Sequence, residues 1–586
     1  MKYGERQVAE ILGGFSGVKL PAGTGCTLSE KRRKILGDPR YEKYLGEIAK
    51  KTEEYREKPI EALKFSEFRL FSETGDRETY QKSYFDRRSR LAALALAVWL
   101  RRKPEDAAAL EDAIWAVCDE YTWALPAHIW GEFDEENRPT LDLFAAETTS
   151  ALAEICALNE ELLSPAVTER AREAVKKRVI ERFLSEEFGW ERLKNNWAAV
   201  CGGAVGIAAL YLCKPEKAAK AVCKLQTAME SYISGFPDDG AGTEGVSYWA
   251  YGFTFFAAYA EMLCRLSGGK IDLFSDTRVK NIALFQQKAY FPFGGAVKFA
   301  DCSEGDSSRW WGLCSYLKTR YREAEFLPKP LLPSFDCDPC YRWAGIFRDL
   351  VWSAEPETRS IDNKSYIFPS AEWLIASGER SSGLAVKGGN NGESHNHNDV
   401  GQVEFYLNGD EVLIDYGGGV YDRDYFGEGR YERFECGSQG HSVPIVGGKY
   451  QKAGREFAAK NVEISERSFC ADISPAYGNE NLASLVRTVN FDTKGGLELS
   501  DCIEFKGFPE SVCERFVSFC EPTVEGGRIL LKGKNGTAVM TFDGEKFCAE
   551  ITSVKAPKPQ DGRRIYIIDF KAKKQEMSVR FEMKIC

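Results

Sequence analysis

Residues 402–414 read QVEFYLNGDEVLI, and this stretch indicates how the second half of the chain folds. Apolar and polar residues alternate on both sides of Asn408-Gly409, a favoured two-residue turn between antiparallel strands. Glycine-containing turns recur at 495–496 and 543–544, with alternating segments between them. The later part of the chain therefore predicts an antiparallel β-sandwich.

The first half has a helical period instead. Residues 88–101 (RSRLAALALAVWLR) carry apolar side chains at helical spacing and stop before Pro104, and residues 253–266 repeat the pattern. Short breaks separate such segments, as expected of antiparallel neighbouring helices. The segments are too numerous for a single-layer bundle, which favours pairs of helices arranged in a ring. We therefore predict a helical domain over residues 1–355 and a β-sandwich over residues 356–586.

Composition excludes several kinds of partner. The formal net charge is −10 and the pI about 5.4, which argues against nucleic-acid binding. The 18 cysteines are scattered, as expected of reduced thiols in a cytosol. The chain starts without a signal-peptide pattern and contains no membrane-spanning run. We expect a cytoplasmic protein without a membrane partner, either a monomer or a homo-oligomer. Locally converging arginines and lysines could still bind an anionic ligand.

Three of the four histidines flank the predicted hairpin. His395 and His397 precede its first strand, Asp415 directly follows its second strand, and His441 lies in the next connection. Imidazole nitrogen and carboxylate oxygen are ligand types that a zinc-like ion accepts. The cluster predicts a metal or catalytic site at the end of the sheet away from the turn. The alternative is a set of hydrogen-bonded histidines without a metal.

The same stretches resemble the heparinase II/III family of polysaccharide lyases. The matching motifs are ESHNHNDVG at 393–401, VLIDYG at 412–417, RYE at 430–432 and GHSVP at 440–444. Weaker matches in the helical half are WALPAH at 123–128, DLFAAET at 142–148, NNW at 195–197 and the segment 239–248. The resemblance implies an incomplete (α/α) toroid joined to an antiparallel β-sandwich. It also implies cleavage of uronic-acid polysaccharides by β-elimination.

The resemblance assigns catalytic roles to Tyr248, His395 and Asn196. Elimination removes the C5 proton of the uronate and expels the sugar at O4, so negative charge develops on the carboxylate, which the Asn196 amide would face. A neutral tyrosine, with an ordinary pKa of about 10, suits the acid role at O4. Tyr248 could also remove the C5 proton, or His395 could be the base. The sequence leaves both open.

The family's zinc ligands map to His397, Asp415 and His441. His395 and His397 are two residues apart, so in an extended segment their side chains point to opposite faces. One would then face the substrate and the other the metal. We expect a structural Zn²⁺ that holds the loops presenting His395, and no organic cofactor.

The expected contacts to an anionic oligosaccharide are His128, Trp197, Arg88, Arg430 and Glu244. Trp197 stands where many relatives have a histidine, so one imidazole of the toroid is missing. Each assignment has a structural alternative: a core histidine for His128, a solvated helix start for Arg88 and its neighbours Arg87 and Arg90, and an N-cap for Asn196.

The leading functional hypothesis is a lyase acting on glycosaminoglycan-type substrates such as hyaluronan, chondroitin or heparan, with an exolytic preference. An inverting glycoside hydrolase is the first alternative. It would need two carboxylates about 6.5–9.5 Å apart, with Glu147, Asp239 and Glu244 as candidates. A cupin-like metal enzyme and a non-catalytic sugar-binding protein are further alternatives.

Overall fold

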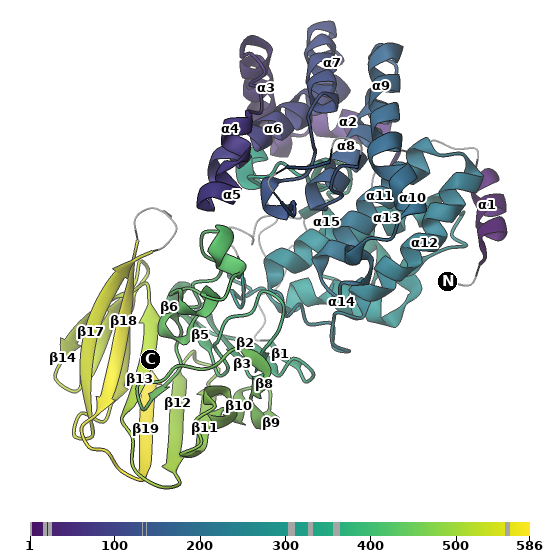
Figure 1. The fold of residues 1–586 in the computed structure, drawn as a ribbon. Helices are drawn as coiled ribbons and strands as arrows, with labels where there is room; N and C mark the ends of the chain where they lie inside the picture. Colours follow the sequence, from purple (N-terminus) through teal and green to yellow (C-terminus); the bar gives the residue numbers. More distant parts are fainter. Residues whose placement is uncertain are drawn as a thin grey trace.

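The computed structural model describes residues 3–15, 20–21, 26–131, 133–135, 138–302, 311–325, 332–354, 364–556 and 563–586. Helices dominate the chain up to residue 351 and strands follow from residue 365, which confirms the predicted fold class. Figure 1 shows the helices gathered at one end of the molecule and the sheets at the other. The predicted boundary at 355/356 lies outside the described residues and stays a prediction.

The helices are α1 (Glu5–Gly13), α2 (Leu28–Gly37), α3 (Glu42–Glu57), α4 (Phe65–Phe68), α5 (Leu70–Thr74), α6 (Glu78–Arg101), α7 (Pro104–Cys118), α8 (Leu143–Asn159), α9 (Pro165–Val175), α10 (Glu181–Ser185), α11 (Asn196–Leu212), α12 (Pro215–Ile233), α13 (Val246–Leu266), α14 (Thr277–Lys288), α15 (Trp311–Arg320) and α16 (Trp343–Val351). In the described part of the chain, none is long and apolar enough to cross a membrane.

Two helices begin earlier than their apolar patterns predict. α6 starts at Glu78 rather than Arg88, because Tyr80 and Tyr84 are buried one turn apart and extend its packed face. α13 starts at Val246 rather than residue 253. The longer α13 carries Tyr248 in its first turn, so this residue lies on a helix end and not in a loop.

The strands are β1 (Ser365–Phe368), β2 (Trp373–Gly378), β3 (Ser382–Lys387), β4 (Asn390–Asn391), β5 (Val403–Leu407), β6 (Asp410–Leu413), β7 (Ile445–Val446), β8 (Gly454–Ala458), β9 (Lys460–Ile464), β10 (Ser468–Asp472), β11 (Leu482–Phe491), β12 (Leu497–Phe505), β13 (Val512–Ser518), β14 (Glu521–Glu525), β15 (Arg528–Lys532), β16 (Thr537–Phe542), β17 (Phe547–Lys555), β18 (Arg564–Ala572) and β19 (Ser578–Ile585). They form a five-stranded sheet in the order β1-β2-β3-β5-β6, an eight-stranded sheet β14-β15-β16-β19-β12-β11-β10-β9, a four-stranded sheet β17-β18-β13-β7 and the pair β4-β8.

The predicted hairpin is confirmed as β5–β6. Leu407 pairs with Asp410, and Asn408 and Gly409 between them have φ of +56° and +79°, as a tight hairpin turn of this type requires. Neighbouring residues of β5 point to opposite faces. The ring of Tyr406 packs against Phe291 on the helical side, with ring centroids 4.9 Å apart. The ring of Phe405 packs on the other face against Phe491 of β11, with centroids 6.3 Å apart.

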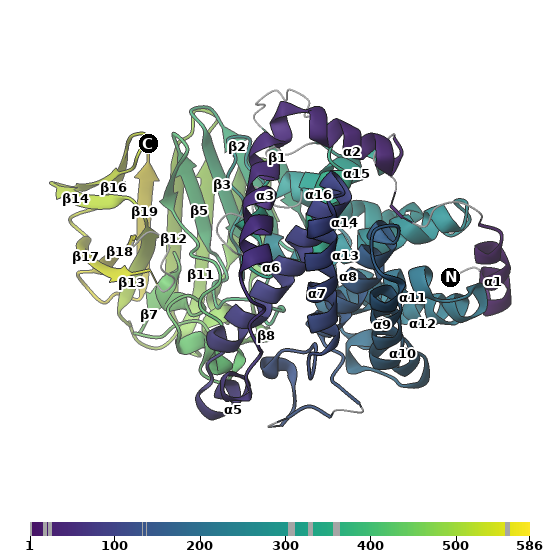
Figure 2. The same ribbon diagram turned by 90° about the horizontal axis from the view of Figure 1, so that it is seen from above.

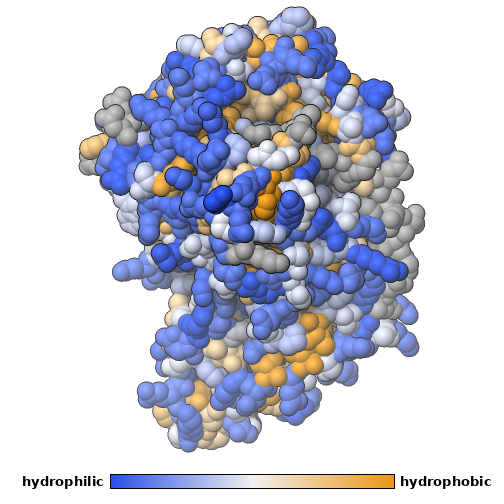
Figure 3. Space-filling view, turned by 90° about the vertical axis from the view of Figure 1, so that its right-hand side faces the viewer, coloured by the Kyte–Doolittle hydropathy of each residue, from blue (hydrophilic) through white to orange (hydrophobic). Residues whose placement is uncertain are grey.

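The five-stranded sheet is therefore buried on both faces. Figure 2 shows it lying between the helices and the outer strands. The core of the helical domain continues into it through Phe368 and Trp373, whose rings contact Phe285. This shared core fixes the sandwich against the helices and so places loops of the β-domain at the helix ends. The outer surface in Figure 3 is largely hydrophilic.

Candidate active site and metal cluster

A cleft of about 640 Å³ lies where the helical domain meets loops of the β-domain. Asn196, Tyr248 and His395, the three predicted catalytic residues, all line it. The helical side of the cleft is built largely from the first turns or N-caps of α6, α8, α11, α13 and α16. Helix N-termini carry positive partial charge, so their convergence favours an anionic ligand.

Local sequence fixes the two helical residues in this cleft. Asn195, not Asn196, caps α11 by accepting a hydrogen bond from the Trp197 backbone N–H at 3.1 Å. Asn196 is thus free of the capping role that was its alternative, and its side-chain oxygen is buried without a hydrogen-bond partner among the described residues. Gly245 precedes α13 with φ of +96°, and a Cβ there would lie 2.7 Å from the Phe299 carbonyl oxygen. Only glycine allows the backbone to pass this close to Phe299 just before the helix turn that carries Tyr248.

Tyr248 and His395 are in direct contact across the two domains. Their rings stack with centroids 3.8 Å apart and an interplanar angle of 20°. The Tyr248 hydroxyl also shares a hydrogen bond of 2.8 Å with the hydroxyl of Tyr421. Burial, and then the nearby Asp301 carboxylate, raise the pKa of Tyr248, so its phenol is protonated at neutral pH. Tyr421, which also lines the cleft, was missed by the sequence analysis.

Asp301 is the carboxylate that organises the β-domain side of the site. It accepts hydrogen bonds from His395 Nδ1 at 2.8 Å, His397 Nε2 at 3.1 Å, the Tyr425 hydroxyl at 2.5 Å and Arg430 at 3.1 Å. Burial would raise the pKa of Asp301, but the hydrogen bonds from the two histidines outweigh it and hold the pKa well below its usual range. Asp301 is therefore ionised, and both imidazoles donate to it.

The expectation that His395 and His397 lie in an extended segment is wrong. His395 has φ of +57°, a left-handed conformation that is uncommon outside glycine and asparagine. The two histidines approach different oxygens of the same Asp301 carboxylate. They nevertheless separate as expected in environment, because His395 lines the cleft whereas His397 is completely buried.

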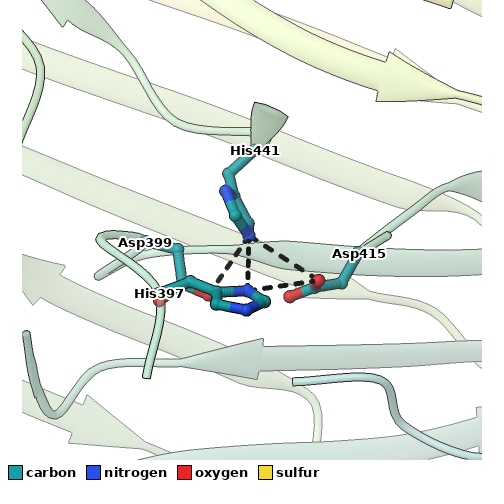
Figure 4. A group of neighbouring side chains, drawn as sticks. All are labelled: His397, Asp399, Asp415 and His441. Atoms are coloured by element: carbon teal, nitrogen blue, oxygen red, sulfur yellow. Dashed lines mark hydrogen bonds and ion pairs between the residues drawn. The ribbon is translucent and has the colours of Figure 1, made fainter. Parts of the chain in front are cut away.

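The predicted metal ligands come together behind the cleft. His397, Asp415 and His441 are buried in one cluster with Asp399, a fourth residue that the sequence analysis did not assign (Figure 4). His397 Nδ1 lies 3.1 Å from His441 Nε2, which lies 3.6 Å from an Asp415 oxygen and 3.9 Å from an Asp399 oxygen. Tetrahedral zinc with bonds of about 2.0–2.2 Å separates its ligands by roughly 3.4 Å. The donor set and spacing fit such an ion.

The hydrogen bonds that His397 and His441 make through their outer ring nitrogens are compatible with a metal ion between the two rings. His441 Nδ1 donates to the Gly437 carbonyl at 2.9 Å, and His397 Nε2 donates to Asp301. The two facing nitrogens, 3.1 Å apart, must then share a proton or a metal ion, because two lone pairs repel each other. One oxygen each of Asp399 and Asp415 also lacks a hydrogen-bond partner among the described side chains. Backbone and carboxylate partners of this kind orient histidine ligands around metals.

The expected substrate contacts divide between cleft and core. His128 and Trp197 line the cleft, where their rings meet edge to face at 5.1 Å and His128 Nδ1 lies 2.7 Å from Asp142. Arg88 does not reach the cleft. It is neither a substrate contact nor a solvated helix start in this structure, because it is buried in a two-pronged pair with Glu120 at 2.8 Å.

Arg430 and Glu244 each interact with another part of the protein. Arg430 is buried against Asp301 and holds that carboxylate in place. Glu244 and Asn195 line a separate polar hollow of about 500 Å³, and the Glu244 carboxylate accepts a hydrogen bond from the Asn196 backbone N–H at 3.3 Å. Neither residue lines the cleft that holds Tyr248.

Comparisons with known proteins agree with this architecture. Residues 363–507 match the family model described as heparinase II/III-like, C-terminal, so the chain contains a heparinase II/III-like region. A comparison with curated proteins found no match.

Solved structures share the whole fold at low identity. A heparinase III structure is 14% identical, with a TM-score of 0.62 and coverage of 96% of this chain and 92% of the other. A mutant of heparan sulfate lyase HepC from Pedobacter heparinus is 13% identical, with a TM-score of 0.59 and coverage of 96% of this chain and 92% of the other. Chondroitin AC lyase from Streptomyces coelicolor A3 is 12% identical, with a TM-score of 0.54 and coverage of 95% and 82%. The chain thus has the toroid-plus-sandwich fold of these lyases.

Proposed function

We propose that this chain, which carries a heparinase II/III-like C-terminal region on a lyase fold, cleaves uronic-acid-containing oligosaccharides or polysaccharides by β-elimination. The observation that carries the proposal is the meeting of Asn196, Tyr248 and His395 in one cleft. An amide, a phenol and an imidazole are the groups that the reaction needs beside one sugar junction. The lyase structures that share the fold act on heparan sulfate and chondroitin, which supports a glycosaminoglycan-type substrate.

The cleft suits the charge that develops during the reaction. Removing the C5 proton places negative charge on the uronate carboxylate, and donors fixed around that group lower the barrier. Asn196 is buried at the N-terminus of α11 with its amide on the cleft wall. The surrounding helix N-termini add positive potential in a partly dry site, where electrostatic interactions are stronger than in water.

The geometry favours His395 as base and Tyr248 as acid. With His395 Nδ1 donating to ionised Asp301, the other ring nitrogen is the one that can accept the C5 proton. Tyr248 has a raised pKa and keeps its proton, which it can hand to the departing O4. A tyrosine acting alone as base would have to become a phenolate against this shift.

We also propose that Zn²⁺ binds His397, Asp399, Asp415 and His441. All four side chains are completely or almost completely buried, which leaves no route for a substrate to reach the ion. A bound ion would hold three loops of the β-domain in register and, through the His397–Asp301 hydrogen bond, support the carboxylate that orients His395. The cupin-like alternative needs an accessible metal, so the burial of this cluster opposes it.

None of the three carboxylates named for the hydrolase alternative lines the cleft. Glu147 is buried and does not line the cleft, and its carboxylate accepts a hydrogen bond from the Tyr251 hydroxyl. Burial raises the pKa of Glu147 to about 7. Asp239 accepts hydrogen bonds from the Ser370 and Ala371 backbone N–H groups. Glu244 lies in the separate hollow.

The test is product analysis on purified protein with hyaluronan, chondroitin and heparan oligosaccharides. A lyase forms a 4,5-unsaturated uronate, which absorbs in the ultraviolet, and consumes no water. Incorporation of ¹⁸O from labelled water into the new ends, without the ultraviolet chromophore, would sink the proposal in favour of hydrolysis.

A further inference from the structure

Arg77 is a cation in the cleft that the mechanism above does not use. It lies at the N-cap position of α6, is half-buried, and lines the same cleft as Tyr248 and Asn196. Among the described residues it forms no ion pair or hydrogen bond through its side chain, and its Nε is buried without a partner. A buried Nε–H without an acceptor is costly, and an anion bound in the cleft would supply that acceptor.

Other arginines around the cleft differ in this respect. Each is tied to a carboxylate, as the pairs Arg342–Asp338 at 2.7 Å, Arg430–Asp301 at 3.1 Å, Arg88–Glu120 at 2.8 Å and Arg433–Asp422 at 2.9 Å show. These four guanidinium groups are structural. Arg77 alone of this set has its donors available to a ligand.

The surroundings of Arg77 identify the part of the ligand that it would meet. Arg77 lines the same cleft as the phenols of Tyr248 and Tyr421, which share a hydrogen bond of 2.8 Å. In a uronate the carboxylate is attached to C5, next to the C4–O4 bond that breaks. A sugar whose C4–O4 bond meets Tyr248 therefore brings its carboxylate into the cleft that Arg77 lines, and the planar guanidinium fork matches the two carboxylate oxygens.

We propose that Arg77 binds the uronate carboxylate at the cleavage junction together with Asn196. Arg77 thereby supplies a positive charge that Trp197, standing in place of the family's histidine, cannot. The assignment rests on the proposed lyase function and extends it by naming the specificity-determining cation. It predicts that the cleft selects a charged uronate over the matching neutral sugar.

Binding measurements separate this assignment from catalysis. Calorimetric titrations in a Tyr248→Phe background would compare an unsulfated chondroitin tetrasaccharide with its carboxyl-reduced form. With Arg77 present, the carboxylate form should bind about 10- to 100-fold more tightly, the range expected for charge-assisted hydrogen bonds. Arg77→Gln should lose most of that ratio, and Arg77→Lys should retain part of it. Lys82→Gln, which removes an exposed cation farther along the same helix, should leave the ratio intact.

Two results would overturn the role of Arg77. The first is an Arg77→Gln variant that keeps the full preference, or a parent that shows none. The second is a lower melting temperature for Arg77→Gln, because a cation awaiting a ligand stabilises nothing in the free protein whereas a structural one does. Failure of the lyase proposal looks different: the chain with Tyr248 intact forms no unsaturated product, while the carboxylate preference and its loss in Arg77→Gln persist.

Discussion

His395 and His397 are two residues apart and bind the same Asp301 carboxylate, yet they belong to different parts of the molecule. His395 lines the cleft and touches Tyr248 of the helical domain. His397 is completely buried and faces His441, Asp399 and Asp415. Exposure, not residue type, thus separates the imidazole proposed to react, that of His395, from the one proposed to be structural, that of His397. Variants on each side should therefore differ in whether they change rate or stability.

Tyr248→Phe should have the largest effect, confined to the cleft. Loss of the phenolic proton should lower kcat by about 10²–10⁴-fold, the usual range for a general acid. Substrate binding and melting temperature should change little, because the ring stack on His395 is retained. Steady-state kinetics by ultraviolet absorbance gives the result, and full activity would refute the acid assignment.

Asp301→Asn should affect both rate and stability, because Asp301 accepts hydrogen bonds from His395 in the cleft and from the buried His397. Loss of the charge that orients His395 should lower kcat by about 10- to 100-fold, as is typical of groups that position a reacting histidine or metal ligand. It also leaves Arg430 buried without a charged partner, at a cost of about 3–5 kcal/mol in the free energy of unfolding.

The stability effect of Asp301 carries a pH signature. Its pKa is lowered on folding, so its contribution is fully present above about pH 4, the ordinary aspartate value, and is lost as pH falls through the folded pKa. The difference in stability between parent and Asp301→Asn should thus be constant near neutrality and shrink in acid. Urea unfolding at several pH values measures it, and a difference that grows in acid would contradict the assignment.

His441→Ala should act on stability more than on rate. Removing this ligand, or stripping the metal with a chelator, should lower the free energy of unfolding by about 1–3 kcal/mol, an ordinary range for a buried substitution, and kcat should fall by less than Tyr248→Phe causes. Elemental analysis of the parent together with melting curves tests this. An unchanged melting curve and a metal-free parent would remove Zn²⁺ from the account.

Arg88→Gln should have the smallest effect on catalysis. Breaking the buried pair with Glu120 should cost about 3–5 kcal/mol of stability. At a temperature where the variant is folded, kcat/KM should equal that of the parent, since Arg88 does not line the cleft. A selective loss in kcat/KM would restore Arg88 as a substrate contact.

The sequence predicted those parts of the molecule that local patterns encode. The β5–β6 hairpin followed from alternation around Asn408-Gly409, and the cluster of His397, Asp415 and His441 followed from their positions at the ends of those strands. Asp399 could have been added, because it lies two residues after His397 at the same end of the sheet.

Asp301 and Arg77 could not be found in this way. Asp301 lies 94 residues before His395, and no periodic segment or motif surrounds it. Arg77 precedes the apolar stretch of α6, so no helical pattern marks it. Arg88 shows the opposite error, since an arginine at the expected helix start proved to be deep within a longer helix and paired with Glu120. Long-range packing decided all three.

Asp301 comes from the helical half of the chain, whereas every side chain that donates to it comes from beyond residue 390. The proposed base, His395, consequently gains its carboxylate partner only when the two domains are docked. Swinging the halves apart to admit a bulky polymer would pull His395 off its carboxylate, so wider access and a correctly aligned base exclude each other. The shared core at Phe285, Phe368 and Trp373, which keeps the domains docked, therefore also keeps His395 aligned.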